Sequence, residues 1–178
     1  MGTPREPRPA KYFVALLAAE AAILMDVEKD LSAILGDIDD RSEVMPWLES
    51  SYYEREMGAG LLRRFLSFAP LLAPDQVARI KLRAQEIELN YRRPRSGGRR
   101  VNIDPGYLDA FKVVLASTKN ASQRVYLHSG IYAETTLHYY NGGFHGLPYT
   151  YPDYLRPETL AFLGRLRSVY LAQLRPCS

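Results

Sequence analysis

In the first part of the chain, the spacing of apolar residues changes from that of a strand to that of a helix and back. The nearly unbroken apolar run 12–18 predicts a strand that is covered on both faces. Apolar residues at steps of three and four between 23 and 34 predict an amphipathic helix, and Gly36 is a natural end for it. An irregular strand over 38–47 and a more regular strand over 61–68 are expected next.

The clearest helix of the sequence begins at Pro74. Proline suits the first turn of a helix, and apolar residues then recur at three- and four-residue steps as far as Tyr91. A further strand over 100–103 would complete the order strand, helix, strand, strand, helix, strand. That is the order of a ferredoxin-like sandwich, which is one topology among several that the first half allows.

The second half reads as a run of strands that ends in a helix. Strand patterns cover 111–117, 123–127 and 131–140, and Pro157 opens a final helix with a leucine-rich stripe. Because these strands follow one another in the sequence, antiparallel pairing is favoured. We therefore predict an α+β fold with a mainly antiparallel sheet and three main helices. An all-helical structure or a doubly wound parallel sheet would contradict this prediction.

Length and composition are those of an ordinary globular domain. The chain has 178 residues, of which 47% are hydrophobic and 24% are charged. We expect a flexible tail over 1–10, which holds three prolines, and a single domain over 11–178. The lone cysteine, Cys177, permits no disulfide within the chain, which favours a reducing cytoplasm. No apolar run reaches the ~20 residues of a membrane helix, and a net charge of +3 does not by itself imply nucleic acid.

The sequence Asp104-Pro105-Gly106 has the composition of a tight turn. Aspartate suits the first position, proline the second, and glycine supplies a positive φ at the third. In one interpretation the turn only ends a strand. In the other it also fixes Asn102 and Asp104 at a strand end, where ligand-binding groups often lie.

Residues 124–140 predict a hairpin whose register brings two charged residues together. His128-Ser129-Gly130 has the length and the glycine of a three-residue loop. The expected cross-strand pairs are Leu127 with Ile131, Val125 with Ala133, Tyr126 with Tyr132 and Arg124 with Glu134. Arg124 and Glu134 are then either an ion pair on a solvated face of the sheet or an anchored carboxylate in a pocket.

Two other groups of polar residues have a simple and a functional interpretation. Five arginines surround Ser96-Gly97-Gly98: Arg92, Arg93, Arg95, Arg99 and Arg100. In the simple interpretation they form a solvated loop that is mobile and not helical. In the functional interpretation the loop could hold a phosphate. The three histidines are His128, His138 and His145, and their spacing matches no zinc pattern. We therefore predict no metal site.

Several phrases of the chain are distinctive when they are taken together. They are Glu56-Met57-Gly58-x-Gly60, Arg64-Phe65-Leu66-Ser67-Phe68, the segment from Val101 to Leu108, Leu115-Ala116-Ser117-Thr118-Lys119, Gly130-Ile131-Tyr132-Ala133-Glu134 and the segment from Pro148 to Tyr154. These phrases resemble those of an uncharacterised prokaryotic family, the domain of unknown function 4416. They span almost the whole chain. The resemblance implies a stand-alone cytoplasmic domain of about this length, and it carries over no activity.

Two hypotheses from different classes follow. In the first, the domain binds, or also acts on, an anionic small molecule that is phosphorylated or nucleotide-like. Its candidates are Asp104 and Glu134 as catalytic carboxylates, and Asn102, Lys112, Lys119, Arg124 and Tyr132 as ligand-binding groups. In the second, a non-catalytic module binds a protein or RNA through a tyrosine-rich surface. A concave pocket with at least three of the polar candidates would favour the first hypothesis, and an exposed tyrosine face without a cavity would favour the second. The sequence assigns no cofactor, reaction or oligomeric state.

Overall fold

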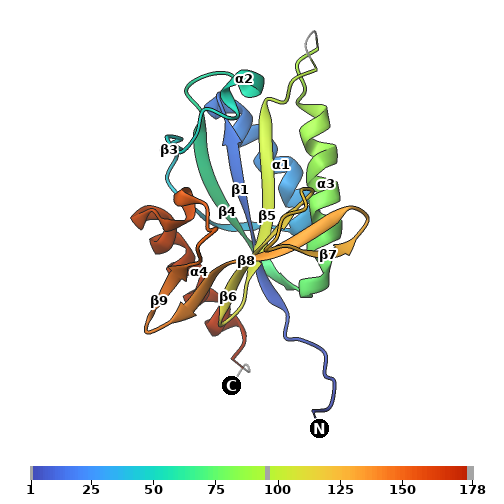
Figure 1. The fold of residues 1–178 in the computed structure, drawn as a ribbon, viewed down its shortest axis with the longest axis vertical. Coiled ribbons are helices and arrows are strands. Elements are labelled where there is room, and N and C mark those ends of the chain that lie inside the picture. The colour runs from blue at the N-terminus through green and yellow to red at the C-terminus, as the bar shows by residue number, and fades with distance from the viewer. Residues whose placement is uncertain (1, 95–96, 176–178) are drawn as a thin grey trace.

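A computed structural model describes residues 2–94 and 97–175 of the chain. Its elements, in order, are β1 Ala10–Ala18, α1 Ala21–Leu35, β2 Ile38–Arg41, β3 Met45–Pro46, α2 Glu54–Met57, β4 Leu62–Leu72, η1 Pro74–Gln76, α3 Val77–Asn90, β5 Val101–Leu108, β6 Lys112–Ser117, β7 Val125–His128, β8 Ile131–Tyr140, β9 Gly143–Gly146, η2 Pro152–Leu155 and α4 Pro157–Gln173. Residues 2–9 have no regular structure and extend away from the body (Figure 1).

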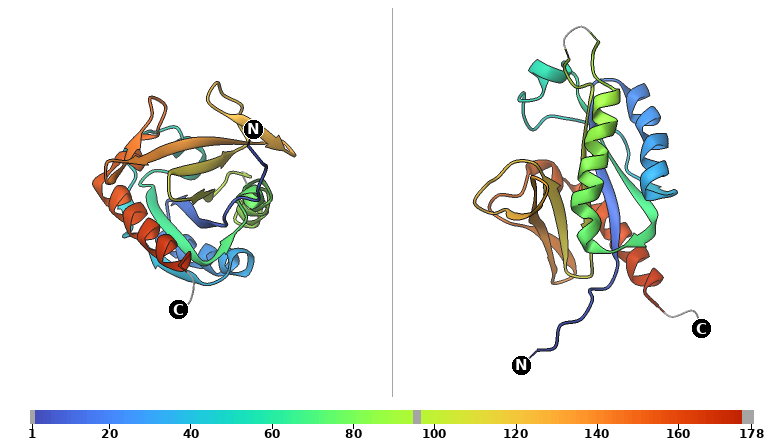
Figure 2. Two further views of the ribbon diagram at one scale, coloured as in Figure 1. Left: turned by 90° about the horizontal axis from the view of Figure 1, so that it is seen from below. Right: turned by 90° about the vertical axis from the view of Figure 1, so that its right-hand side faces the viewer.

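All the strands belong to one antiparallel sheet. Its order is β2-β4-β1-β5-β6-β8-β7, with β3 beside β4 and β9 beside β8. The helices α1 and α3 cover one face, and α4 lies against the opposite face of the curved sheet (Figure 2). The predicted α+β class is therefore confirmed, and the described part of the chain has three longer helices and the short α2. None of the described helices is long and apolar enough to cross a bilayer.

The first half has the ferredoxin-like topology that the order of its elements suggested. β1 lies between β4 and β5, and β2 lies on the outer side of β4, all antiparallel. All nine residues of β1 are buried, because it is the central strand and helices cover both faces. The side of α1 that carries Ile23, Val27 and Leu31 packs on this sheet together with α3.

The predicted turn at 104–106 is wrong, because β5 continues through it. Pro105 is paired with Val14 of β1, and pairing with β6 begins only at Gly106. Proline is tolerated where one side of a strand has no neighbour. Gly106 is needed for close packing, since a Cβ atom there would lie 2.6 Å from the carbonyl oxygen of Val114 and 2.9 Å from Cζ of Phe13. The tertiary neighbours of this segment override its local turn composition.

The hairpin of β7 and β8 has most of the predicted register but a different turn. Val125 faces Ala133 and Tyr126 faces Tyr132 as expected, whereas His128, and not Leu127, faces Ile131. The turn consists of two residues, Ser129 and Gly130, with φ of 53° and 78°. A register shift between Tyr126 and His128 restores the expected pairs, so Arg124 still lies beside Glu134.

The basic loop after α3 is not a continuation of that helix, as predicted. The helix ends at Asn90, and the loop is held where it is described: Arg93 donates to the carbonyl oxygen of Met57, and Arg99 binds Glu56. Arg95 and Ser96 lie outside the described residues. The mobility of this loop stays a prediction.

The strands β5 and β6 diverge, and this divergence creates the space for a site. Only residues 106–108 of β5 pair with β6, whereas β6 pairs with β8 along its whole length. On its open side, β5 is bound by side chains of α3: Ile103 N–H donates to Glu88 at 2.7 Å, and Lys81 Nζ donates to the Ile103 carbonyl oxygen at 2.7 Å. Pro105, two residues on, has no N–H that would need a partner on this side.

Candidate functional site

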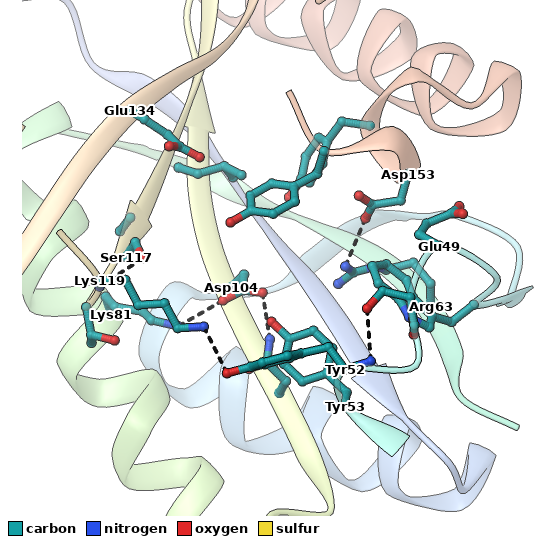
Figure 3. A pocket seen from close by; sticks show the side chains of 18 of the residues that line it. Glu49, Tyr52, Tyr53, Arg63, Lys81, Asp104, Ser117, Lys119, Glu134 and Asp153 are labelled. Carbon is teal, nitrogen blue, oxygen red and sulfur yellow. Dashed lines mark hydrogen bonds and ion pairs between the residues drawn. The ribbon is translucent and has the colours of Figure 1, made fainter. Parts of the chain in front are cut away.

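A cavity of about 430 Å³ lies where β5 and β6 separate (Figure 3). Its walls come from the loop after β3, from β4, α3, β5, β6 and β8, and from η2. Five cations line it: Arg63, Lys81, Arg99, Lys119 and Arg124. Five carboxylates line it as well: Glu49, Glu88, Asp104, Glu134 and Asp153. Such a density of ionisable groups in one concave site is typical of a functional site.

The structure brings five of the seven candidate residues to this cavity: Asn102, Asp104, Lys119, Arg124 and Glu134. Lys112 does not belong to it, because it lies at the far end of β6 and forms an ion pair with Asp109. Tyr132 is also outside it and packs edge-on against Tyr126, with ring centroids 5.4 Å apart. These two candidate ligand-binding residues therefore do not line the cavity. A six-residue strand separates its ends by roughly 17 Å. Tyr132 lies opposite Ser117, on the same face of β8 as Glu134 but closer to the end of the strand.

Arg124 and Glu134 form the predicted pair, but in a cavity wall and not on a solvated face. Arg124 Nε lies 2.9 Å from Glu134 Oε2, and both side chains are buried. The other guanidinium nitrogens donate to Ser117 Oγ at 2.7 Å, the carbonyl oxygen of Lys119 at 2.9 Å and Tyr151 Oη at 3.0 Å. Arg124 thus holds three segments of the wall together, and its donors have protein partners.

Asp104 accepts hydrogen bonds from one charged and one neutral side chain. Lys81 Nζ lies 3.0 Å from one carboxylate oxygen, and Asn102 Nδ2 donates to the other at 2.6 Å. Asn102 is itself oriented by Arg99, which donates to its Oδ1 at 2.9 Å. Burial acts to raise the pKa of Asp104, but the charges of Lys81 and Arg63 outweigh it and leave this pKa below its ordinary value. Asp104 is therefore an ionised, oriented carboxylate.

Sequence reasoning missed a second ion pair, which joins Arg63 of β4 to Asp153 of η2. Arg63 Nη2 lies 2.9 Å from Asp153 Oδ2, and the guanidinium also lies 4.6 Å from the ring centroid of Trp47. The Nε and Nη1 donors of Arg63 and the hydroxyl of Tyr154 are buried without a hydrogen-bond partner among the described residues. Burial raises the pKa of Asp153, and the charge of Arg63 only partly opposes this. A signal did exist, because Arg63 shares the inward face of β4 with Phe65.

The α3 residues Lys81 and Glu88 were missed as well. They lie beside the apolar stripe of that helix and are buried, whereas most charged residues at such positions reach solvent. Burial raises the pKa of Glu88, and the charge of Lys81 partly opposes it. Both side chains reach the cavity through the gap between β5 and β6.

Lys119 differs from the other cations of the cavity. It is exposed, and its Nζ lies 3.5 Å from Tyr52 Oη and 4.8 Å from the centroid of that ring (Figure 3). No carboxylate in the described part of the chain pairs with it. Its charge is therefore available to a bound anion.

The histidines take no part in this cavity. His138 and His145 face each other on β8 and β9, and His128 ends β7. Within residues 2–94 and 97–175, no three His, Cys, Asp or Glu side chains are placed so that they could hold a metal ion.

The chain belongs to the family described as "Domain of unknown function (DUF4416)", which it matches over residues 8–170. No curated protein and no solved structure matches it. Family membership thus agrees with the resemblance seen in the sequence, and the cavity itself is the source for any statement about function.

Proposed function

We propose that this protein binds a small organic anion, phosphorylated or nucleotide-like, in the cavity between β5 and β6, and that it does so in the cytoplasm. The observation that carries the proposal is Lys119, an accessible ammonium group at a cavity of about 430 Å³ that pairs with no carboxylate of the described residues. Four other cations line the same space, but the carboxylates of the cavity offset their charge, so Lys119 supplies the positive charge that attracts an anion.

The incomplete pairing of Arg63 supports the same proposal. A buried donor without a partner costs about 1–3 kcal/mol, and Arg63 has two donors at the wall of the cavity that find no partner among the described residues. An oxygen of a bound anion would satisfy them after a small rotation of the side chain. Guanidinium groups are well suited to phosphate and carboxylate oxygens.

Aromatic side chains give the cavity room for a flat organic group. Trp47, Tyr52, Tyr53 and Tyr151 line it, and Tyr52 and Tyr53 pack edge-to-face with centroids 5.0 Å apart. Small-molecule sites commonly combine such apolar walls with a few oriented polar groups. This combination favours an organic anion over a simple inorganic one.

Binding is better supported than catalysis by the two candidate carboxylates. Asp104 has a lowered pKa, which makes it a weak proton acceptor at neutral pH. Glu134 is enclosed by Arg124 and by Gln123, whose Nε2 donates to it at 3.0 Å. We therefore assign both residues to orienting the site and its ligand.

A thermal-shift screen with nucleotides and phosphorylated metabolites tests the proposal, because a ligand of the folded state raises the melting temperature. At least one compound should stabilise the protein. Lys119→Ala should weaken its binding about tenfold or more, as expected for the loss of a charge-assisted contact. Lys112→Ala removes the same charge outside the cavity and should leave binding unchanged. Equal effects of the two variants would contradict the proposal.

A second candidate function is a protein- or RNA-interaction module. The observation in its favour is β7, an outer strand whose four residues are all exposed, among them Val125 at 69% and Tyr126 at 56%. Exposed apolar groups on an outer strand suit a macromolecular partner. Val125→Thr together with Tyr126→Thr should then abolish a complex, while binding in the cavity is retained.

A further inference from the structure

Asp104 is the cavity carboxylate that a ligand can reach. Its side chain is 31% exposed, compared with 15% for Glu49, 8% for Glu88 and 2% for each of Glu134 and Asp153. Asp104 lies between Arg63 and Lys81 in the same cavity (Figure 3). Any ligand bound to Lys119 in this space would therefore also meet a negative group.

The carboxylate of Asp104 has acceptor capacity that residues 2–94 and 97–175 do not use. An ionised carboxylate offers about four lone-pair sites, and Lys81 and Asn102 occupy one on each oxygen. A series of side-chain hydrogen bonds, from Glu56 through Arg99 to Asn102, fixes the orientation of the Asp104 carboxylate. Two acceptor sites, one on each oxygen, are therefore preorganised for a pair of donors.

Neutral donors fit this position better than a cationic one. Lys81 Nζ already lies 3.0 Å from Asp104, and Arg63 is close enough to act on its charge. A ligand ammonium group would meet these like charges, whereas hydroxyl groups would not. We infer that Asp104 accepts hydrogen bonds from two neighbouring hydroxyl groups of the ligand, which makes the ligand a phosphorylated polyol such as a sugar phosphate or a ribonucleotide. This inference rests on the proposed binding of an anion in the cavity.

The test compares ligands that differ only in these hydroxyl groups. Dissociation constants of the intact protein are measured by calorimetry for ribonucleoside 5′-monophosphates and their 2′,3′-dideoxy counterparts, and for ribose 5-phosphate and 2-deoxyribose 5-phosphate. The hydroxylated member of a pair should bind about tenfold or more tightly, as expected for hydrogen bonds to a charged acceptor. In Asp104→Asn, which keeps the shape and an acceptor for Lys81, the difference should fall to about threefold or less.

The outcomes separate the inference from the proposal on which it rests. Equal binding of both members of each pair by the wild-type protein would overturn the role of Asp104 and leave the anion site intact. Tight binding of phosphorylated amines without hydroxyl groups would overturn it as well. If none of the phosphates binds, the proposed function fails together with the inference. Because the wild-type comparison decides alone, a poorly folded Asp104→Asn variant would not remove the test.

Discussion

At the scale of single residues, the ion pairs of the cavity are of two kinds. Arg124 and Glu134 have partners for their polar atoms, and their pairing follows from a hairpin register that short-range sequence patterns can predict. Arg63 and Asp153 keep unpaired polar atoms and come from distant parts of the chain. No local pattern joins such distant residues, so the sequence could not reveal this pair.

The Arg63–Asp153 pair allows a direct test of its energetics. Arg63→Met should lower the free energy of unfolding by about 3–5 kcal/mol, because Asp153 would remain buried without its partner. Arg63→Met combined with Asp153→Leu should lose less than the single variant, since no unpaired charge remains. Urea denaturation measures both. Arg83→Ala, at an exposed pair with Glu86, is the control and should cost less than about 1 kcal/mol. A double variant that is less stable than the single one would show that the pair is not coupled in this way.

At the scale of elements, periodicity predicted most of the structure, and local composition failed where tertiary contacts decide. The helices after 20, 76 and 156 and the strands of both halves follow their apolar spacing. The predicted turn at 104–106 was wrong because Pro105 lies where β5 has one open side and Gly106 permits the close approach of β6. β9 was missed, although Asn141-Gly142, with φ of 48° and 80°, is a common two-residue hairpin turn. The divergence of β5 and β6 creates the cavity. The spacing of apolar residues within either strand does not predict this divergence.

Gly106 marks the position where this divergence begins, and its replacement should be costly. Gly106→Ala places a Cβ 2.6 Å from backbone of β6, so the two strands must shift, and we expect a loss of about 1–3 kcal/mol or more in the free energy of unfolding. The same substitution at Gly164, in the middle of α4 with no atom within 4 Å, should stabilise the protein by about 0.5–1 kcal/mol. Equal effects of the two substitutions in urea denaturation would contradict this packing role of Gly106.

At the scale of the whole molecule, the two halves share one central strand. Tyr12 and Val14 of β1 contribute to the core beneath α1 and α3, while Phe13 and Ala15 contribute to the core beneath α4. The cavity likewise takes residues from both halves, such as Arg63 and Asp153. The ferredoxin-like half therefore shares a strand and a cavity with the second half. The single domain over 11–178 stays a prediction.

Unfolding in urea should consequently be a single cooperative transition. The lone tryptophan, Trp47, lies at the cavity and reports on its integrity by fluorescence, while far-UV circular dichroism reports on the helices on both faces. In a two-state transition the two signals give the same midpoint. A chain that ends after residue 110 should not fold stably, because residues 106–108 would lose β6 and the core beneath α4 would lose its cover. If the fluorescence changed at a lower urea concentration than the dichroism, the cavity would open before the sheet, and the site would be a separate unit of low stability.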